Sequence, residues 1–318
     1  MRVGVMLSQS LVSLDHVPLQ ALADAGVWAV LLRCFEDEIR WRAPAAEAFA
    51  RSAAEAGLRV FLVPAGYGGV FCPEQHPTSL FVQAHPQTRQ VDLRGRRIPR
   101  ACPNNPAYIE WLTSSLRTLA WLIDADGFVW EEPGFYYNRG LWTCRCSYCQ
   151  GRYASQFGGT MPAELSPQLA GLRQRSIADL VATISGAVKG VDSRLACLLM
   201  PTPAPQSGAI PNGNENWRQL SAVPDLDGLI VSWPPGTATD EPLSGALSLW
   251  KDLPAWVEHG TLMLLRLLCN SNSEEAALTL RHLAAADVPA IVLECPEPLT
   301  ADLPRGVKAL LRMVAETA

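Results

Sequence analysis

Hydrophobic residues gather in eight short runs along the chain. Each run is almost continuously apolar, which is typical of parallel β-strands that are covered on both faces. The runs span residues 2–7, 27–34, 58–64, 126–131, 194–200, 226–233, 262–269 and 289–295. The pattern therefore predicts eight strands in a parallel sheet.

Between most of these runs, apolar residues recur with a helical period. The clearest segment is 106–123, where Asn105 can cap the first turn and Pro106 fits into it. Other helices are predicted at 44–56, at 274–286 and, most weakly, near 215–222. Strands and helices therefore alternate along the chain.

Eight such alternations predict an α/β fold, a single (β/α)₈ TIM barrel that spans 1–318. An open, doubly wound sheet is the alternative, but it usually carries a glycine-rich turn after its first strand, and Ser8-Gln9-Ser10-Leu11 has no glycine. The loops that leave the third and fourth strands, 65–105 and 132–165, are long. Because barrel active sites form from the loops that follow strands, we expect these two loops to wall the barrel mouth.

Composition narrows the range of partners. Hydrophobic residues make up 48% of the 318 positions and charged residues 18%, enough for a large core. The net charge is -5, and Arg94-Gly95-Arg96-Arg97 is the one basic cluster, so we expect no nucleic-acid partner. No apolar run reaches about 18 residues, so we expect no membrane partner. A homo-oligomer remains compatible with the sequence.

The nine cysteines do not form the pattern of a disulfide framework. Cys144, Cys146 and Cys149 lie in the loop after the fourth strand, and Cys102 lies just before the helix that leads into that strand. Four thiolates in a tetrahedron favour a structural Zn²⁺. Cys72 is the alternative fourth ligand. The remaining thiols should pack inside strands, and a reducing, cytoplasmic location is expected.

The segment around these cysteines resembles a known family. Cys102, the run Cys144-Arg145-Cys146-Ser147-Tyr148-Cys149 and Phe157 resemble the zinc site of the family 42 β-galactosidases. Cys102-Pro103-Asn104-Asn105-Pro106 and Asp126-Gly127-Phe128-Val129-Trp130-Glu131-Glu132-Pro133 also resemble uncharacterised glycoside-hydrolase-like barrels. The similarity covers residues 100–160. It implies a clan A barrel that hydrolyses glycosides with two carboxylates.

Carried over to this chain, the resemblance places the general acid/base on Glu132, with Glu131 replacing an asparagine. The family's nucleophile ends the seventh strand, but Arg266-Leu267-Leu268-Cys269-Asn270 contains no carboxylate. Neighbouring strand residues face opposite sides, so one of Glu131 and Glu132 should face the mouth, and we favour Glu132. Glu294 is the first choice for the second carboxylate, with Glu36 and Glu215 as alternatives.

Two arginines lie inside apolar strands and need partners if they are buried. Acids such as Glu294 or Glu36 can pair with Arg33 and Arg266, which can alternatively bind an anionic ligand. Aromatic residues gather near the predicted mouth, where flat rings suit sugars. The predicted substrate-binding residues are Arg33, Glu36, Tyr67, Trp130, Tyr136, Trp233 and Arg266.

Two functions are compatible with these residues. The first is a glycoside hydrolase that acts on a saccharide with a carboxylate acid/base after strand four and a structural zinc. The alternative is a catalytically inactive barrel that binds a saccharide or another small polar ligand. The sequence lacks the G-x-S-x-G and P-loop motifs and has no His-x-His in the first strand, which argues against serine-hydrolase, nucleotide-binding and catalytic-metal chemistry.

Overall fold

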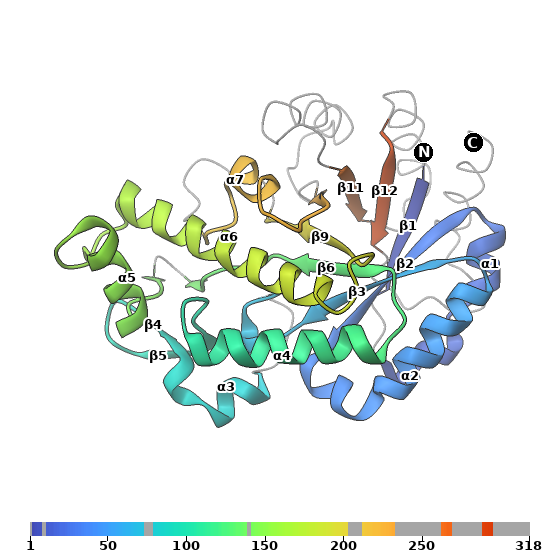
Figure 1. The fold of residues 1–318 in the computed structure, drawn as a ribbon, viewed down its shortest axis with the longest axis horizontal. Coiled ribbons are helices and arrows are strands. Elements are labelled where there is room, and N and C mark those ends of the chain that lie inside the picture. Colours follow the sequence, from blue (N-terminus) through green and yellow to red (C-terminus); the bar gives the residue numbers. More distant parts are fainter. Residues whose placement is uncertain are drawn as a thin grey trace.

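A computed structural model describes residues 2–7, 11–72, 79–138, 141–202, 212–232, 262–268 and 288–294. Within them eight parallel strands close into a barrel, and their order around the ring follows their order in the sequence (Figure 1). The strands are β1 (Arg2–Leu7), β2 (Val27–Phe35), β3 (Arg59–Ala65), β6 (Gly127–Glu131), β9 (Ala196–Met200), β10 (Gly228–Ser232), β11 (Leu262–Leu268) and β12 (Ala290–Glu294). Each coincides with a predicted run, so the (β/α)₈ TIM barrel is confirmed.

The barrel interior is packed with apolar side chains from alternate positions of the strands. Leu31, Val129 and Val292 belong to this inner cluster. Their neighbours in the sequence, such as Leu32 and Trp130, belong to a second cluster that lies between the strands and the outer helices. This alternation decides which polar residues at the strand ends face inward.

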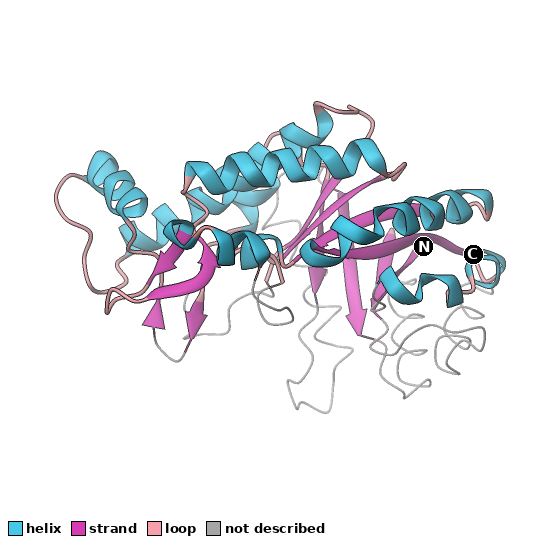
Figure 2. Cartoon of the chain, turned by 90° about the horizontal axis from the view of Figure 1, so that it is seen from below, coloured by secondary structure: helices cyan, strands magenta, loops and turns pink. Residues whose placement is uncertain are grey.

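In the described part of the chain, helices cover the outside of the barrel between the strands from β1 to β10 (Figure 2). Asn105 caps α4 by accepting hydrogen bonds from the backbone N–H groups of Ala107 and Tyr108, as the sequence predicted. The helices are α1 (Leu19–Asp24), α2 (Glu36–Glu55), α3 (Leu80–Ala84), α4 (Pro106–Leu122), α5 (Ser147–Phe157), α6 (Pro167–Lys189) and α7 (Trp217–Ser221), with 3₁₀ turns η1 (Leu11–His16), η2 (Tyr67–Gly69) and η3 (Pro86–Thr88). No helix in the described segments is long and apolar enough to cross a membrane.

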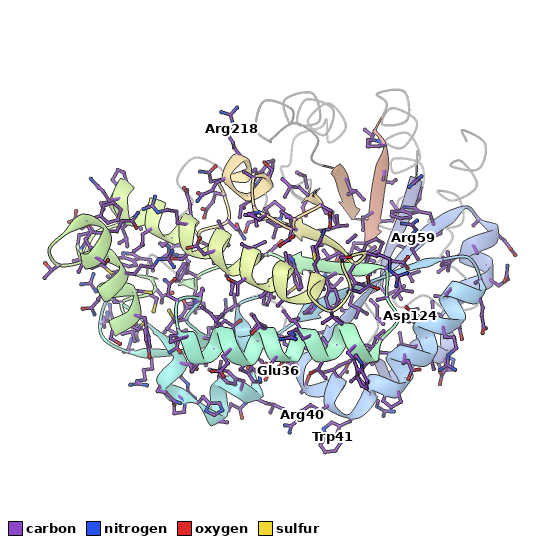
Figure 3. The ribbon with its side chains drawn as sticks, viewed as in Figure 1. Glu36, Arg40, Trp41, Arg59, Asp124 and Arg218 are labelled. Atoms are coloured by element: carbon purple, nitrogen blue, oxygen red, sulfur yellow. The ribbon has the colours of Figure 1, made fainter. Side chains whose placement is uncertain are left out.

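Helix α2 starts earlier than the predicted segment 44–56, because its first turn carries Glu36, Asp37 and Glu38. Acidic side chains stabilise the positive end of a helix, and the helix continues through Pro44. Arg40 and Trp41 on this helix point away from the barrel (Figure 3). The weak segment near 215–222 contains α7, whereas the predicted helix at 274–286 lies outside the described residues.

The two long loops contain structure of their own. The first holds α3 and the hairpin of β4 (Arg89–Val91) and β5 (Arg97–Ala101), and the second holds α5 and the pair β7 (Tyr137–Asn138) and β8 (Leu141–Trp142). The Arg145 N–H donates to the Val91 carbonyl at 2.8 Å, and Asp92 forms a bridge with Thr143. The two loops therefore join into one lobe beside the barrel, at the left of Figure 1.

Strand β6 approaches β9 so closely that only glycine fits at position 127. A Cβ atom on Gly127 would collide with the carbonyl oxygen of Ala196. We predict that G127A lowers the free energy of unfolding by about 1–3 kcal/mol. Gly151 in α5 has open space around it, so G151A should raise stability by up to about 1 kcal/mol. Urea denaturation of both variants tests this, and an unchanged G127A midpoint would contradict the packing.

Candidate functional site

An ion triad lies at the carboxyl end of the barrel. The Arg33 guanidinium binds Glu131 through two hydrogen bonds, Nη2 to Oε1 at 2.8 Å and Nε to Oε2 at 3.1 Å. The same Nη2 atom contacts Glu294 Oε1 at 2.9 Å. Arg33 therefore joins two carboxylates that are far apart in the sequence.

Barrel closure explains how these residues meet. Arg33 lies near the carboxyl end of β2, Glu131 ends β6 and Glu294 ends β12. Arg33 and Glu131 have the same strand parity as the inward-facing Leu31 and Val129. Because both carboxylates contact one nitrogen, their bound oxygens lie within about 6 Å of each other, with the Arg33 guanidinium between them.

The triad is shielded from solvent. Arg33, Glu131 and Glu294 are 5%, 2% and 6% exposed. Burial works against the charge of Arg33, but the neighbouring Glu131 outweighs it and holds the pKa of the guanidinium above its ordinary value. Each charge in the triad is stable at this depth because an opposite charge contacts it.

Cys72 also contacts the triad. Its thiol donates to Glu131 Oε2 at 2.7 Å, and its backbone N–H donates to the Glu131 carbonyl at 3.0 Å. Burial, with the nearby Glu131 carboxylate, raises the pKa of the Cys72 thiol well above its ordinary value, so it remains a protonated donor. The sequence offered Cys72 only as a metal ligand, because nothing in its neighbours indicates a contact with Glu131.

Strand parity places Glu131, and not the favoured Glu132, in the triad. Glu132 leaves the strand with a left-handed backbone, φ 47°, and is half-buried. Its N–H donates to the Met200 carbonyl at 2.7 Å, and the N–H of Gly134 donates to the Val70 carbonyl at 3.1 Å. A non-glycine residue in this conformation stores strain, which is typical of functional sites. The catalytic roles of both glutamates stay predictions.

Three residues predicted to bind substrate lie outside the barrel interior. Trp130 is fully buried between β6 and α6, and its Nε1 donates to Ser185 Oγ at 2.9 Å. Glu36 accepts from the backbone of Gly68 and Phe81, and with Tyr67 it lines an outer groove of about 830 Å³ between α2, α3 and α4. These positions correct the expectation of a mouth location, because Trp130 has outward parity and Glu36 begins a helix.

The other predicted residues are also placed away from the triad or are not described. Tyr136 lies in the side lobe, where the Arg100 guanidinium stacks over its ring at 4.5 Å. Glu215, an alternative second carboxylate, accepts from the Gly213 N–H at 2.9 Å. Trp233 and the side chain of Arg266 lie outside the described residues.

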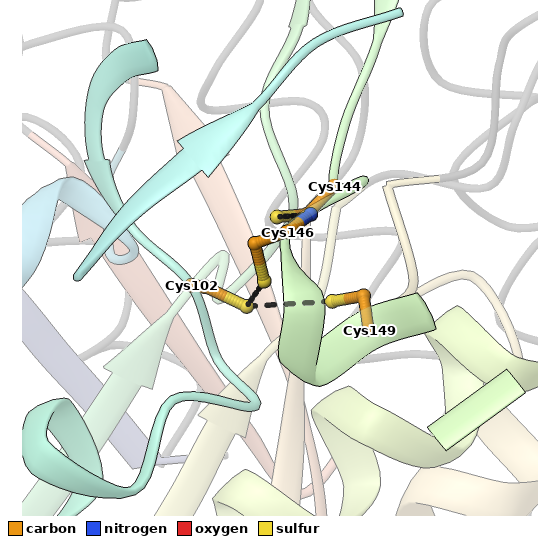
Figure 4. A group of neighbouring side chains, drawn as sticks. All are labelled: Cys102, Cys144, Cys146 and Cys149. Atoms are coloured by element: carbon orange, nitrogen blue, oxygen red, sulfur yellow. Dashed lines mark hydrogen bonds between the residues drawn. The ribbon is translucent and has the colours of Figure 1, made fainter. Parts of the chain in front are cut away.

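Four cysteines meet where the two long loops join (Figure 4). The Sγ atoms of Cys102, Cys144, Cys146 and Cys149 all lie within 4.8 Å of one another. Cys102 Sγ lies 3.4 Å from Cys149 Sγ and 3.5 Å from Cys146 Sγ. The predicted meeting of Cys102 with the three later cysteines is therefore confirmed, and Cys72 takes no part in the cluster.

The geometry of the cluster fits a tetrahedral metal. Four sulfurs at about 2.3 Å from one ion are about 3.8 Å apart, near the observed separations. The backbone N–H groups of Val91 and Cys146 donate to Cys144 Sγ at 3.3 and 3.4 Å, and the Asn104 N–H donates to Cys102 Sγ at 3.4 Å. Donors of this kind stabilise thiolates. Hydrogen bonds from the other three thiols lower the pKa of Cys146.

Comparison with solved structures identifies the same barrel fold in enzymes that act on sugars. An α-L-fucosidase from Paenibacillus thiaminolyticus matches with a TM-score of 0.66 and 17% identity over 99% of this chain and 49% of its own. A GH42 β-galactosidase from G. stearothermophilus matches with a TM-score of 0.65 and 12% identity, and the match covers 99% of this chain and 55% of the β-galactosidase. A fungal β-1,4-galactanase matches with a TM-score of 0.55 and 14% identity, and the match covers 98% of this chain and 99% of the galactanase.

These matches extend the resemblance to the fold. The chain spans about half the length of the fucosidase and the β-galactosidase, whereas it covers the galactanase almost completely. No protein-family model matches the chain, and no curated protein matches its sequence. The resemblance to family 42 β-galactosidase barrels is thus confirmed for the fold, at low sequence identity.

The triad makes a prediction about stability. R33M leaves two buried carboxylates without their shared cation, so the free energy of unfolding should fall by about 3–5 kcal/mol. R194M removes an arginine whose side chain is 88% exposed and pairs with Asp192, and it should change stability little because solvent screens that pair. Urea unfolding at neutral pH compares the two variants. Equal losses in the free energy of unfolding would show that the buried triad stabilises the fold no more than an exposed ion pair does.

Proposed function

We propose that this chain is a glycoside hydrolase whose substrate binds at the carboxyl end of the barrel. The observation that carries the proposal is the joining of Glu131 and Glu294 by Arg33 at that end. Glycoside hydrolysis needs two carboxylates on either side of the scissile bond, and the triad brings Glu294 to the end of β6, which Glu132 directly follows. The fold supports the proposal because the matched fucosidase, β-galactosidase and galactanase all act on glycosides by name.

The contacts favour a different role for each of the three glutamates. Glu131 is held by Arg33 and Cys72 and is the most buried, which suits an anchor for the site. Glu294 contacts the same guanidinium, and we assign it the role of nucleophile or base. Glu132 is half-buried, directly follows Glu131 in the chain and supplies the proton to the leaving group, as the family resemblance implies. Backbone hydrogen bonds on both sides of Glu132 fix its position.

We further propose that Zn²⁺ is the ion of the four-cysteine cluster. Cys102 comes from the first long loop, and Cys144, Cys146 and Cys149 come from the second. A closed shell of four thiolates leaves no position for a reacting molecule, so this ion supplies cross-linking and not catalysis. The described cysteines are all free thiols, which agrees with the proposed cytoplasmic location.

A second function is favoured by one observation. Strand β11 is the seventh barrel strand, where the family carries its nucleophile, and its sequence from Leu262 to Leu268 contains no carboxylate. A barrel that binds a saccharide or another small polar ligand without cleaving it would need no such residue. Turnover by the wild-type protein separates the two functions.

The roles of the glutamates predict distinct kinetic defects. E132Q should lower kcat for nitrophenyl glycosides by about 10²–10⁴-fold, because a general acid contributes about that much. The loss should shrink for dinitrophenyl glycosides, whose leaving group needs no proton. E294Q should lose activity with both kinds of leaving group. Steady-state assays on a panel of chromogenic glycosides measure these values.

The matched control is E47Q, since Glu47 pairs with Arg51 on the exposed face of α2 and should leave kcat unchanged. Saccharide binding without turnover by the wild type would support the binding function instead. Full activity of E132Q would exclude it as the general acid.

The metal site predicts a stoichiometry and a stability change. The purified protein should contain about one zinc per chain, and C149A should lose it, whereas C34A should keep it because Cys34 packs in the barrel wall. Stripping the zinc should lower Tm by roughly 5–10 °C, as the loss of a few kcal/mol implies. Elemental analysis and thermal unfolding test this. Equal metal content in C149A and the wild type would rule out the cluster as the site.

A further inference from the structure

Helix α6 carries a buried arginine without a hydrogen-bond partner. Arg173 is 2% exposed, and its Nε, Nη1 and Nη2 atoms have no partner among the described residues. It lies on the apolar face of α6, one helical turn from the buried Leu169 and Ile177. A buried guanidinium is costly unless negative charge compensates it, so a compensating group must lie nearby.

The aromatic rings around Arg173 supply part of this compensation. The guanidinium carbon lies 4.8 Å from the ring centre of Phe135 and 5.9 Å from that of Trp142. Such cation–π contacts are attractive, but a ring carries no net charge. Trp142 also leads directly into the cysteine cluster, since Cys144 follows two residues later.

Three acidic groups lie within electrostatic range of the guanidinium. Burial lowers the pKa of Arg173 to about 10, and negative charge on Glu215 and, when they are ionised, on Cys149 and Cys144 opposes this shift. Two of these groups are ligands of the four-cysteine cluster. A divalent ion bound to four thiolates leaves a net charge of -2, which attracts a nearby cation.

We propose that Arg173 is the buried counter-cation of the four-cysteine metal centre, so that metal binding and burial of this guanidinium stabilise each other. The inference rests on the proposed metal site and adds a residue outside its ligand set. It also assigns a role to α6, which packs beside α5, the helix that carries Cys149 (Figure 1).

Two other arginines beside the cluster, Arg145 and Arg152, are bound elsewhere. Arg145 donates to the carbonyl oxygens of Met161 and Pro162, and Arg152 donates to Asn104 Oδ1 at 2.9 Å and to Asp179. Their guanidinium groups therefore have hydrogen-bond acceptors. Arg173 differs because its guanidinium has no such acceptor in the described part of the chain.

Glu215 is the competing partner for Arg173. Glu215 is half-buried, and this partial burial raises its pKa, which weakens its ionised form. Its Oε1 accepts from the Gly213 N–H, and no ion pair with Arg173 forms. If Glu215 were the partner of Arg173, the effect of removing the arginine would not depend on the metal.

The test compares zinc affinity and stability in variants of the full chain. R173M removes the charge while keeping an apolar side chain of similar length. Zinc affinity, measured by competition with a chromophoric chelator, should weaken about tenfold, within the range of ordinary coupling between sites. By the same coupling, R173M should lower Tm more in the zinc-loaded than in the zinc-stripped protein. R173K, which keeps the charge, should bind zinc nearly as tightly as the wild type.

E215Q and R117M, which alters an exposed arginine on α4, serve as controls and should leave zinc affinity unchanged. R173Q replaces R173M if the latter does not fold. The inference is overturned if R173M binds zinc like the wild type, if its Tm loss is equal with and without zinc, or if E215Q reproduces the weakening. A wild-type protein that binds no zinc overturns both the metal site and this inference.

Discussion

The contact on which the candidate site depends is the one between Arg33 and its two carboxylates. An arginine at an inward-facing position of a barrel strand is stable only if acids from other strands reach it. Closure of the ring supplies them, because β6 and β12 flank β2 at distances of two strands on either side. The same closure fixes the position of Glu132. The chain leaves the strand with a left-handed backbone at this residue, and backbone hydrogen bonds to Met200 and Val70 hold the segment on both sides.

A short segment of the chain connects this triad with Arg173 beside the four-cysteine cluster. The chain runs from Glu131 through Glu132 and Gly134 to Phe135, whose ring packs on Arg173. The Phe135 N–H donates to the Asn212 carbonyl at 2.8 Å, which ties the segment to the loop before α7. The lobe that holds the four cysteines is therefore attached directly to the wall of the barrel mouth. In the proposed function, a metal that orders this lobe also helps to hold Glu132 in place.

The sequence was informative wherever a local pattern determined the structure. Eight apolar runs predicted the eight strands, and the place of Cys102 just before the helix that leads into the fourth strand predicted its meeting with the later cysteines. The sequence was uninformative where a shift of one residue along a strand decides whether a side chain faces the barrel interior or the outer helices. Glu131 and Glu132 differ only in parity, and Trp130 faces α6 for the same reason. The helical period of Leu169, Arg173 and Ile177 was a readable sign of a buried arginine, whereas the contact of Cys72 with Glu131 depends on the path of a long loop.

Neutron diffraction from a deuterium-exchanged crystal at neutral pH tests the central claim most directly, because it locates the protons of the triad. The account predicts a fully protonated Arg33 guanidinium, no deuterium on the oxygens of Glu131 or Glu294 that it contacts, and a deuterium on Cys72 Sγ directed at Glu131. A deuterium on either of those carboxylates, or Arg33 turned away from one of them, would contradict the account.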